Sequence, residues 1–455
     1  MESICVRFAH NYLISSSLVK QLFLNKFLIP CLAWCARRIV KLNRPKIVGV
    51  TGSVGKSSTK EAIYLVLKSR HSVRKNLGNL NNEIGLPLAI IGNIDPKSNA
   101  IKWARVMARG LLMAFVKSRD YPKILVLEMA VDRPGNMKYL TSLAPPDVGV
   151  ITNIGVSHLE FFKSQKGILK EKVQIYKLLP KDGLAVINND DFYLRSIKNR
   201  LGTKVVSYGF RKDSDICARE VKIGNENELG EGVSLAQGTI LRISFNTIFL
   251  PLELPNIISK AQLYAALAAA AVGIHFGMNL VEVAKALRDF CPLPGRAQLI
   301  RGKRGNLVID DSYNSSPQSV KDALETLALV KSKKKTVILG DMLELGPMEN
   351  SAHRELASLI RPVAKKAILI GKRTLLTQQE LRRLGFPKDK IFHYKVSTEP
   401  DKQINRIIGS GEVILVKGSQ GLRMEKITEQ LVPKKEWNRL PRQNTEWKSK
   451  PVKEA

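Results

Sequence analysis

Two glycines, a lysine and a serine are closely spaced in TGSVGKSST, residues 51–59, and together they can bind a nucleoside triphosphate. Gly52 and Gly55 let backbone N–H groups approach phosphate oxygens, because a glycine has no side chain to obstruct them. Lys56 supplies a cation for the terminal phosphates, and the hydroxyl of Ser57 can ligate Mg²⁺. We therefore predict a site for a nucleoside triphosphate with Mg²⁺ at this segment.

A predicted strand and a predicted helix flank this loop and would hold it in place. Residues 47–50 form an apolar run typical of a buried strand, and the chain from Lys56 to about Lys68 has the pattern of a helix. The general phosphate-binding motif has a further glycine five residues before Gly55, where this chain has Val50. The alternative is therefore an ordinary glycine turn between a strand and a helix.

Further apolar runs of strand length, each ending in polar or acidic residues, follow at residues 123–129, 148–155 and 183–190. Continuous apolar runs suit parallel strands that are covered on both faces, and such sheets bind ligands beyond the carboxyl ends of their strands. Glu128 ends the first of these runs, and Asn153 and His158 follow the strand part of the second. We expect a phosphate cradle, a carboxylate and an imidazole at one edge of a sheet.

A second α/β pattern begins near Pro292, after short strand-like pieces over residues 200–255, which predict an antiparallel excursion, and an alanine-rich helix over residues 260–276. Its predicted strands lie at residues 306–311, 335–342, 366–371 and 412–418. The expected fold class is therefore α/β, with a phosphate-binding central domain on a parallel sheet and a Rossmann-like C-terminal domain. The expected segments are an apolar and basic N-terminal helical segment (1–46), the central domain (47–290), the C-terminal domain (291–433) and a disordered tail (434–455).

The charge balance favours anionic partners. The chain has 455 residues with 73 Lys and Arg against 40 Asp and Glu, a formal net charge of +33. Nucleotides, nucleic acid and an anionic membrane face all satisfy this bias, but no common nucleic-acid-binding signature is present, so no specific nucleic-acid partner is predicted. The cysteines are odd in number and form no CxxC pair, which indicates unpaired thiols in a reducing compartment.

The N-terminal segment has two open interpretations. Residues 11–36 are mostly apolar, but their longest clean run, residues 27–36, is too short to span a bilayer. A basic cluster follows at Arg37, Arg38, Lys41, Arg44 and Lys46. Such a helix can lie on the anionic cytoplasmic face of a membrane, or it can pack onto the following domain.

With these motifs in place, the chain resembles the Mur ligase family from about residue 47 to residue 431. TGSVGKSST matches that family's variant of the phosphate loop, which also explains the missing glycine. Other motifs of the resemblance are GNLNNEIGLPL, EMAVDRPGNMKYLTSLAPPDVGVITNIGVSHLEFF, LPGRAQ, IDDSYNSSPQS, GDMLELG and KGSQGLRMEK. GNLNNEIG, DDSYN and GDMLELG are typical of the branch that adds D-alanyl-D-alanine.

The resemblance implies an ATP-dependent amide ligase of peptidoglycan precursor synthesis. Such an enzyme activates a substrate carboxylate as an acyl phosphate at the expense of ATP, and an amine then displaces phosphate. The implied substrates are UDP-N-acetylmuramoyl-tripeptide and D-alanyl-D-alanine, and the implied enzyme is a cytoplasmic monomer, with peripheral membrane contact through residues 11–46 as an added hypothesis. Two alternatives remain: a Mur-type ligase with a different, membrane-linked acceptor, and a non-catalytic nucleotide-binding scaffold.

The resemblance also implies roles for individual residues. Arg296 corresponds to a hinge arginine that reaches the γ-phosphate, Asp311 to a carboxylate that binds the ribose, and Lys172 to a carbamylated lysine that holds Mg²⁺, a role that Lys170 two residues earlier fits less well. The nucleotide loop comprises Thr51, Gly52, Ser53, Val54, Gly55, Lys56, Ser57 and Ser58. The implied Mg²⁺ ligands are Ser57, Glu128, His158 and Lys172. The implied substrate-binding residues are Asn79, Asn81, Asn82, Tyr313, Asn314, Lys417 and Arg423.

This sequence departs from the family pattern in two places. The linker helix of the family opens with a G-x-H-N-x-x-N pattern that helps to hold adenine, whereas only Gln262 keeps an amide side chain here. The family also places a domain of about a hundred residues, the size of a small domain, before the phosphate loop to bind the UDP-sugar. Only 46 residues precede Ile47 here, so an atypical mode of uridine recognition is expected.

Overall fold

The computed structural model describes residues 27–97, 99–155, 159–223, 226–229, 233–236, 238–401, 403–444, 447 and 452. For residues 159–160, 226–229 and 233–236 it describes the backbone alone. Four of the expectations fall wholly or partly on residues outside this set. These are the metal-ligand role of His158, the helix over residues 11–26, the thiol of Cys5, and the disordered tail beyond residue 444.

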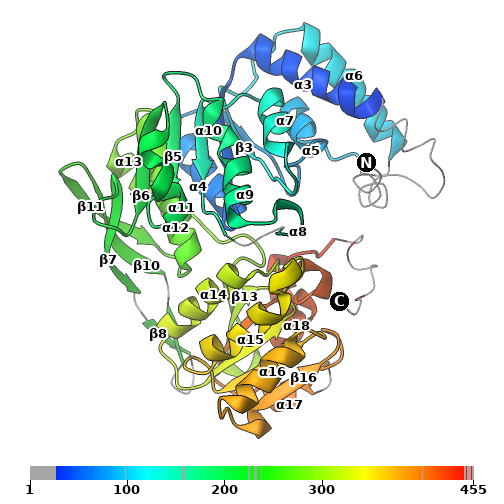
Figure 1. Ribbon diagram of the computed structural model, residues 1–455, viewed down its shortest axis with the longest axis vertical. Helices are drawn as coiled ribbons and strands as arrows, with labels where there is room; N and C mark the ends of the chain where they lie inside the picture. Colours follow the sequence, from blue (N-terminus) through cyan, green and yellow to red (C-terminus); the bar gives the residue numbers. More distant parts are fainter. Residues whose placement is uncertain are drawn as a thin grey trace.

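The described chain forms two α/β bodies, which lie one above the other in Figure 1. The upper body holds the larger sheet and most of the chain from α3 to α13, whereas β8 (Glu226–Leu229) lies beside the lower body, which holds the second sheet and the chain from β12 onward. Both sheets are mainly parallel. The expected fold class, a central domain with a parallel sheet followed by a Rossmann-like C-terminal domain, is confirmed.

Within the described residues, the upper sheet has nine strands in the order β11-β10-β7-β6-β5-β4-β1-β3-β2. All neighbouring pairs from β2 to β7 are parallel, and only β7, β10 and β11 pair antiparallel. The antiparallel excursion is therefore shorter than expected, because the run around Tyr208 is buried beside β5 and continues the parallel sheet. The strands are β1 (Lys46–Thr51), β2 (Val73–Lys75), β3 (Ile124–Glu128), β4 (Val148–Ile151), β5 (Leu184–Asn188), β6 (Lys204–Gly209), β7 (Ile216–Ile223), β10 (Thr239–Phe245) and β11 (Ile248–Leu254).

Helices cover both faces of this sheet, so its central strands are buried on both sides, as their continuous apolar sequences predict. One face packs against α4 (Lys56–Lys68), α12 (Lys260–His275) and α13 (Leu280–Leu287). The other face lies under α3 (Ile29–Asn43), α5 (Gly85–Ile91), α6 (Ala100–Phe115), α7 (Asn136–Leu143), α9 (Gln165–Lys172), α10 (Gln174–Lys177) and α11 (Phe192–Ile197). The short α8 (Leu159–Phe162) precedes α9, and β8 (Glu226–Leu229) pairs with β9 (Val233–Ala236) as a separate ribbon.

The lower sheet has six strands within the described residues, in the order β12-β13-β17-β14-β15-β16, and β12 alone runs antiparallel to its neighbour. Its strands are β12 (Gln298–Arg301), β13 (Leu307–Asp311), β14 (Lys335–Gly340), β15 (Lys366–Ile370), β16 (Ile391–Tyr394) and β17 (Val413–Lys417). Its helices are α14 (Pro317–Leu329), α15 (Glu349–Ile360), α16 (Thr374–Arg383), α17 (Ile404–Ile407) and α18 (Glu425–Leu431).

Residues 434–444 are ordered, so the expectation of a disordered tail is wrong for this stretch. Lys434–Arg439 form a 3₁₀ helix, and Leu440 is buried in the core of the C-terminal body. Arg442 is also buried and forms an ion pair of 2.7 Å with Glu425. The docking depends on two apolar side chains, Leu440 and the partly buried Trp437, and on one buried ion pair, which leave no periodic pattern in the sequence.

The described part of the N-terminal segment packs onto the central domain, which is one of the two interpretations left open. Leu32, Ala33, Cys35, Ala36 and Ile39 of α3 are buried against the helices that cover the sheet. None of the described helices is long and apolar enough to cross a bilayer. The described cysteines are all unpaired, and burial raises the pKa of Cys35 to about 12, with a further contribution from Cys31.

Candidate active site

The phosphate loop lies between β1 and the first turn of α4, as the sequence predicts. Gly52 has a φ of 147°, and a Cβ at this position would lie 1.8 Å from Oγ1 of Thr152, so only glycine fits there. Gly55 has a φ of 84° and caps α4 in the left-handed conformation. The backbone therefore turns tightly enough to leave N–H groups facing the space in front of the helix.

The residues after β4 fix the shape of this loop. Oδ1 of Asn153 accepts hydrogen bonds from the backbone N–H of Ser53 at 3.1 Å and of Val54 at 2.8 Å. The hydroxyl of Thr152 donates to the carbonyl oxygen of Val54 at 2.6 Å. Two neighbouring parallel strands thus present their carboxyl ends at one edge, and the second holds the loop of the first.

Two lysines converge on the carbonyl oxygen of Gly52. Nζ of Lys56 donates to it at 2.9 Å, and Nζ of Lys172 donates to it at 3.1 Å. Burial lowers the pKa of both, because desolvation disfavours an ammonium group. The pKa of Lys172 falls to about 7, and the positive charge of Lys56 contributes to that shift after burial.

The position of Lys172 follows from the residues around α9. Ser164 caps the start of this helix, and the carboxylate of Glu171 accepts hydrogen bonds from the backbone N–H of Gly135 at 3.0 Å and of Met137 at 2.8 Å. Because Glu171 is hydrogen-bonded to the start of α7, the side chain of Lys172 points into the protein interior, next to the phosphate loop. Lys172 is 2% exposed, whereas Lys170 faces solvent.

The carboxylate of Glu128, at the end of β3, is almost fully buried beside this loop. Its Oε1 accepts a hydrogen bond of 3.0 Å from the side chain of Asn81. Its Oε2 accepts no hydrogen bond from the described residues, and Nζ of Lys60 lies 4.0 Å away. A buried carboxylate oxygen without a donor is suited to a cation, so Glu128 and the nearby hydroxyl of Ser57 fit the donor set that Mg²⁺ prefers.

The described residues include no cluster of three or more His, Cys, Asp or Glu side chains able to hold a metal by themselves. A magnesium ion at Glu128 would take its other ligands from single groups such as hydroxyls, substrate phosphates or water, and His158, an expected ligand, lies outside the described residues.

The C-terminal body contributes a second charged pair. Nζ of Lys417, at the end of β17, lies 2.6 Å from Oδ2 of Asp311, at the end of β13, and also donates to the carbonyl oxygen of Asn314 at 2.8 Å. The other oxygen of Asp311 accepts from the backbone N–H of Ala297 at 3.1 Å. β13 and β17 are parallel neighbours, so their carboxyl ends bring these side chains together.

Arg296 lies at the junction of the two bodies. Its guanidinium group stacks over the ring of Tyr313, 4.2 Å from the ring centroid, and its carbonyl oxygen accepts a hydrogen bond of 2.6 Å from Nε2 of Gln262. Tyr313 in turn reaches across to the central body, where its hydroxyl donates to Oδ1 of Asn79 at 2.8 Å.

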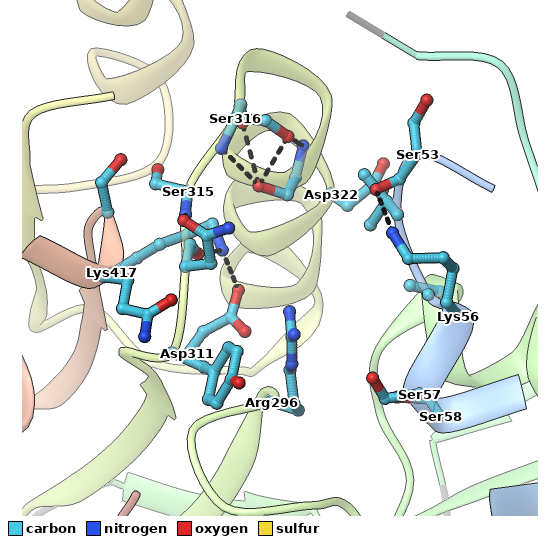
Figure 2. A pocket seen from close by; sticks show the side chains of 18 of the residues that line it. Ser53, Lys56, Ser57, Ser58, Arg296, Asp311, Ser315, Ser316, Asp322 and Lys417 are labelled. Atoms are coloured by element: carbon cyan, nitrogen blue, oxygen red, sulfur yellow. Dashed lines mark hydrogen bonds and ion pairs between the residues drawn. The ribbon is translucent and has the colours of Figure 1, made fainter. Parts of the chain in front are cut away.

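These groups line one cavity of about 400 Å³ between the two bodies. Figure 2 shows Lys56, Ser57 and Ser53 on one side of it, Asp311 and Lys417 on the other, and Arg296 standing between them. The residues expected from the sequence that line this cavity are Ser53, Val54, Gly55, Lys56, Ser57, Ser58, Asn79, Asn81, Glu128, Arg296, Asp311, Tyr313, Asn314 and Lys417.

Five expected site residues lie elsewhere. Thr51 and Gly52 are buried at the start of the phosphate loop and do not line the cavity. Lys172 is also buried, and its Nζ donates to the carbonyl oxygen of Gly52. Oδ1 of Asn82 accepts from the backbone N–H of Gly85 at 2.8 Å, so this side chain supports the start of α5. Arg423 is 3% exposed and pairs with Glu425 at 2.7 Å, so it is not available to a ligand in the cavity, contrary to the expectation that it faces the substrate.

The cavity also includes residues that the sequence analysis did not single out. Asp322 lies on its wall, one turn into α14, and burial raises the pKa of its carboxyl. Ser315, Ser316 and Ser319 surround the start of the same helix, where Ser316 is the N-cap. The motif IDDSYNSSPQS contains the signal of a capped helix, but only the fold shows that this helix end faces the phosphate loop.

Comparisons with known proteins agree with this architecture. The Mur ligase middle domain matches residues 107–273, and the Mur ligase, glutamate ligase domain matches residues 295–420. The UDP-N-acetylmuramoyl-tripeptide–D-alanyl-D-alanine ligase of Bacillus subtilis is 32% identical over 390 residues, which are 85% of this chain and 76% of that protein. The corresponding Escherichia coli ligase is 26% identical over 85% of this chain and 76% of its own length.

Solved structures give the same result. The structure of MurF ligase from Thermotoga maritima in complex with ADP has a TM-score of 0.72 and 28% identity, and covers 92% of this chain and 86% of that chain. MurF from Acinetobacter baumannii shares the fold with a TM-score of 0.73 at 23% identity, over 89% of this chain and 80% of that chain. With both domain matches, a relative above 30% identity and the cavity at the shared domain junction, this chain belongs to the Mur ligase family.

Proposed function

We propose that this chain is an ATP-dependent ligase of peptidoglycan precursor synthesis that joins D-alanyl-D-alanine to a UDP-N-acetylmuramoyl-tripeptide. The observation that carries the proposal is the 32% identity, over 85% of the chain, to the Bacillus subtilis ligase of that name. The likeness to the Thermotoga maritima MurF structure, which contains ADP, supports the use of ATP. We propose that the enzyme acts in the cytoplasm, where ATP is made, and that it is a monomer.

The proposed reaction has two steps. A carboxylate oxygen of the tripeptide attacks the γ-phosphorus of ATP, the bond to the β-phosphate oxygen breaks, and ADP leaves. The amino group of D-alanyl-D-alanine then attacks the carbonyl carbon of the acyl phosphate, phosphate leaves with the electron pair of the C–O bond, and the nitrogen loses a proton. Both steps need alignment of the reactants and neutralisation of negative charge more than a protein nucleophile.

The cavity provides cations on two sides of the space that the phosphates would fill. Lys56 lies in the phosphate loop and Arg296 stands between that loop and the wall that carries Asp311, so together they can neutralise the γ-phosphate from two directions. Ser57 and Glu128 are the described residues that would hold Mg²⁺, and His158 is the further expected ligand. Mg²⁺ bound there would neutralise part of the charge on the phosphate oxygens.

Lys172 is the proposed site of a carbamate. Carbamate formation consumes a neutral amine, and a lysine with a pKa of about 7 is largely neutral near pH 7.5, whereas an ordinary lysine is not. The reaction of the neutral amine with CO₂ forms an N–C bond and releases one proton, which turns the neutral amine into an anion able to hold Mg²⁺. Its burial beneath the loop, against the exposure of Lys170, supports Lys172 as the modified residue.

Gln262 is the proposed contact for adenine. Its Nε2 is committed to the carbonyl oxygen of Arg296, whereas its Oε1 is buried at the cavity wall and accepts no hydrogen bond from the described residues. An amino group of a nucleobase can donate to that oxygen. The family pattern has several amide side chains at this position and this chain has only one, so we expect weaker binding of adenine. Asp311 is the proposed contact for the ribose.

Phosphate release measured with both substrates tests the proposal. The purified protein is incubated with ATP, Mg²⁺ and UDP-N-acetylmuramoyl-tripeptide, with and without D-alanyl-D-alanine, and the products are weighed by mass spectrometry. Release that requires both substrates, with a product heavier by the dipeptide less water, supports the proposal. Protein that binds ATP but gives no product with this pair would reject the proposed substrates and leave the nucleotide site standing.

A further inference from the structure

We propose that the exposed face formed by helices α3 and α6 binds the surface of a lipid bilayer that contains anionic lipids. This inference is independent of the proposed reaction, because it concerns a surface on the outside of the central body. It rests on the arrangement of the two helices, on the apolar side chains that they expose, and on the charges around those side chains.

The two helices form a rigid pair. α3 and α6 pack against each other and against α5, and their inner sides bury Leu32, Ile39, Trp103 and Val106. Gly110 lies where they cross: a Cβ there would be 3.0 Å from Cδ1 of Ile91 and 3.5 Å from Sγ of Cys35. The outer face of this pair is therefore a fixed surface of the folded protein.

Large apolar side chains are concentrated on that outer face. The exposed fractions on or just after α6 are 66% for Ile101, 64% for Leu112, 67% for Phe115 and 55% for Val116. The ring of Trp34, on α3, is 40% exposed and lies 5.7 Å from the ring of Phe115. The aromatic contact makes the exposed apolar sides of the two helices continuous, and a tryptophan with a phenylalanine is typical of side chains that enter a membrane interface.

The two helices that form this face are basic. Neither α3 nor α6 contains an aspartate or a glutamate. The helices and the residue after Val116 carry exposed cations that form no ion pair within the described part of the chain, namely Arg38, Lys41, Lys102, Arg105 and Lys117. Unpaired cations around exposed apolar groups complement a bilayer with anionic headgroups.

The charge pattern also argues against a second copy of this chain as the occupant. A symmetric dimer through this face would bring the same patch against itself, so cations would meet cations. An anionic bilayer instead accepts the apolar side chains among its acyl chains and the cations among its headgroups. The pair lies along the end of the upper body that is remote from the C-terminal body, so a membrane bound there leaves the cavity between the bodies clear (Figure 1).

Flotation of the full-length protein with vesicles tests the proposal. The vesicles contain phosphatidylcholine alone or with about a third of phosphatidylglycerol. We expect binding to the anionic vesicles only, and weaker binding at high salt, because each basic residue near the surface contributes about fivefold to the partition coefficient. The triple substitution Lys41→Gln, Lys102→Gln, Arg105→Gln should then reduce binding by about 100-fold.

A matched pair of double variants separates this face from the general positive charge of the chain. Leu112→Glu with Phe115→Glu should reduce the partition coefficient at least about tenfold, because two apolar side chains that would enter the bilayer are replaced by anions. The control is Phe192→Glu with Ile248→Glu, at side chains 68% and 56% exposed on α11 and β11, which changes the net charge equally. The control should bind as the unchanged protein does.

Two control measurements accompany the binding assay. ATP hydrolysis and the thermal unfolding midpoint, measured without vesicles, should be the same in all variants, which shows that each has folded. Equal loss of binding in both double variants, or no binding by the unchanged protein, would overturn the proposal. A dimer detected by sedimentation would also overturn the proposal if, of the two double variants, only Leu112→Glu with Phe115→Glu dissociated it. The face would then bind a second copy of the chain.

Discussion

The hydroxyl of Tyr313 donates a hydrogen bond of 2.8 Å to Oδ1 of Asn79, and the two residues belong to different bodies of the molecule. The ring of Tyr313 also lies 4.2 Å from the guanidinium of Arg296. One side chain thus connects the C-terminal body, the central body and the proposed γ-phosphate contact. The hydrogen bond between Tyr313 and Asn79 therefore joins the two walls of the cavity.

Tyr313→Phe removes the hydroxyl and keeps the ring. We expect kcat/KM to fall about fivefold, the equivalent of about 1 kcal/mol for one hydrogen bond, with little change in the thermal unfolding midpoint. Tyr394→Phe is the control, since that hydroxyl donates to Gln403 at 2.9 Å far from the cavity. Steady-state ligation rates measure both. Equal losses in the two variants would contradict a specific role for the contact with Asn79.

Lys172 should carry a carbamate in protein equilibrated with ¹³C-labelled CO₂. The neutral fraction of an amine with a pKa of about 7 increases from pH 6 to pH 8, so the carbamate signal in ¹³C NMR spectra should increase over the same range. Lys172→Arg should abolish the signal and reduce ligation about 100-fold, as expected for loss of a group that holds charge at the reaction centre. Lys170→Arg is the control. A signal that survives Lys172→Arg would assign the carbamate to another lysine.

Arg442→Gln tests the ordered tail. Arg442 and its partner Glu425 are both buried, at 3% and 0% side-chain exposure, so removal of the cation should lower the free energy of unfolding by about 3 kcal/mol. Since Arg442 also donates to the carbonyl oxygen of Tyr313, kcat/KM should fall as well. Arg439→Gln, in an exposed pair three residues earlier in the chain, should change stability by less than about 1 kcal/mol. Urea unfolding measures both, and similar effects of the two substitutions would show that the tail is not held by its buried pair.

Asp310 gives a pH dependence of stability. Burial raises the pKa of this carboxyl to about 6 in the folded protein. The pKa is about 3.9 in an unfolded chain, so between pH 4 and pH 6 the folded state binds more protons. The contribution of this group to the free energy of unfolding therefore decreases as the pH rises through that range.

Asp310→Asn removes this titration and keeps an acceptor for the hydroxyl of Thr428, which donates to Oδ1 of Asp310 at 3.0 Å. We expect the variant to gain about 2 kcal/mol over the unchanged protein on going from pH 4 to pH 7, because the carboxyl of the unfolded chain is already half ionised at pH 4. Urea unfolding at the two pH values gives this difference. A stability difference between the two proteins that is the same at both pH values would contradict the raised pKa.

The local chemistry of the phosphate loop can be predicted from its sequence. The spacing of its glycines, lysine and serine is a local feature of the sequence, and so are the patterns of the strand and the helix on either side of it. The apolar runs likewise determined a parallel α/β fold, because strands covered on both faces need continuous apolar sequence. Most of the expected site residues follow directly after such runs, and they do line the cavity.

Which polar side chain at the end of an element faces the cavity depends on contacts between distant segments of the chain. Arg423 and Lys417 are six residues apart, yet Lys417 reaches the cavity and Arg423 is held by Glu425. Asn82 accepts a hydrogen bond from the backbone N–H of Gly85 at the start of α5, while Asn81 reaches Glu128. Lys172 rather than Lys170 enters the interior, because Glu171 ties α9 to α7. Each choice depends on a partner distant in the sequence, which a local pattern does not contain.

The same reason explains the tail and the N-terminal helix. The order of residues 434–444 comes from a buried ion pair and a few apolar contacts with the C-terminal body, and α3 has its place because α5 and α6 offer it an apolar surface. Spacing along the chain determines which residues can form a helix or bind a phosphate. Burial between distant segments determines which of them are enclosed, which are paired and how their pKa values shift, and only the folded structure contains that information.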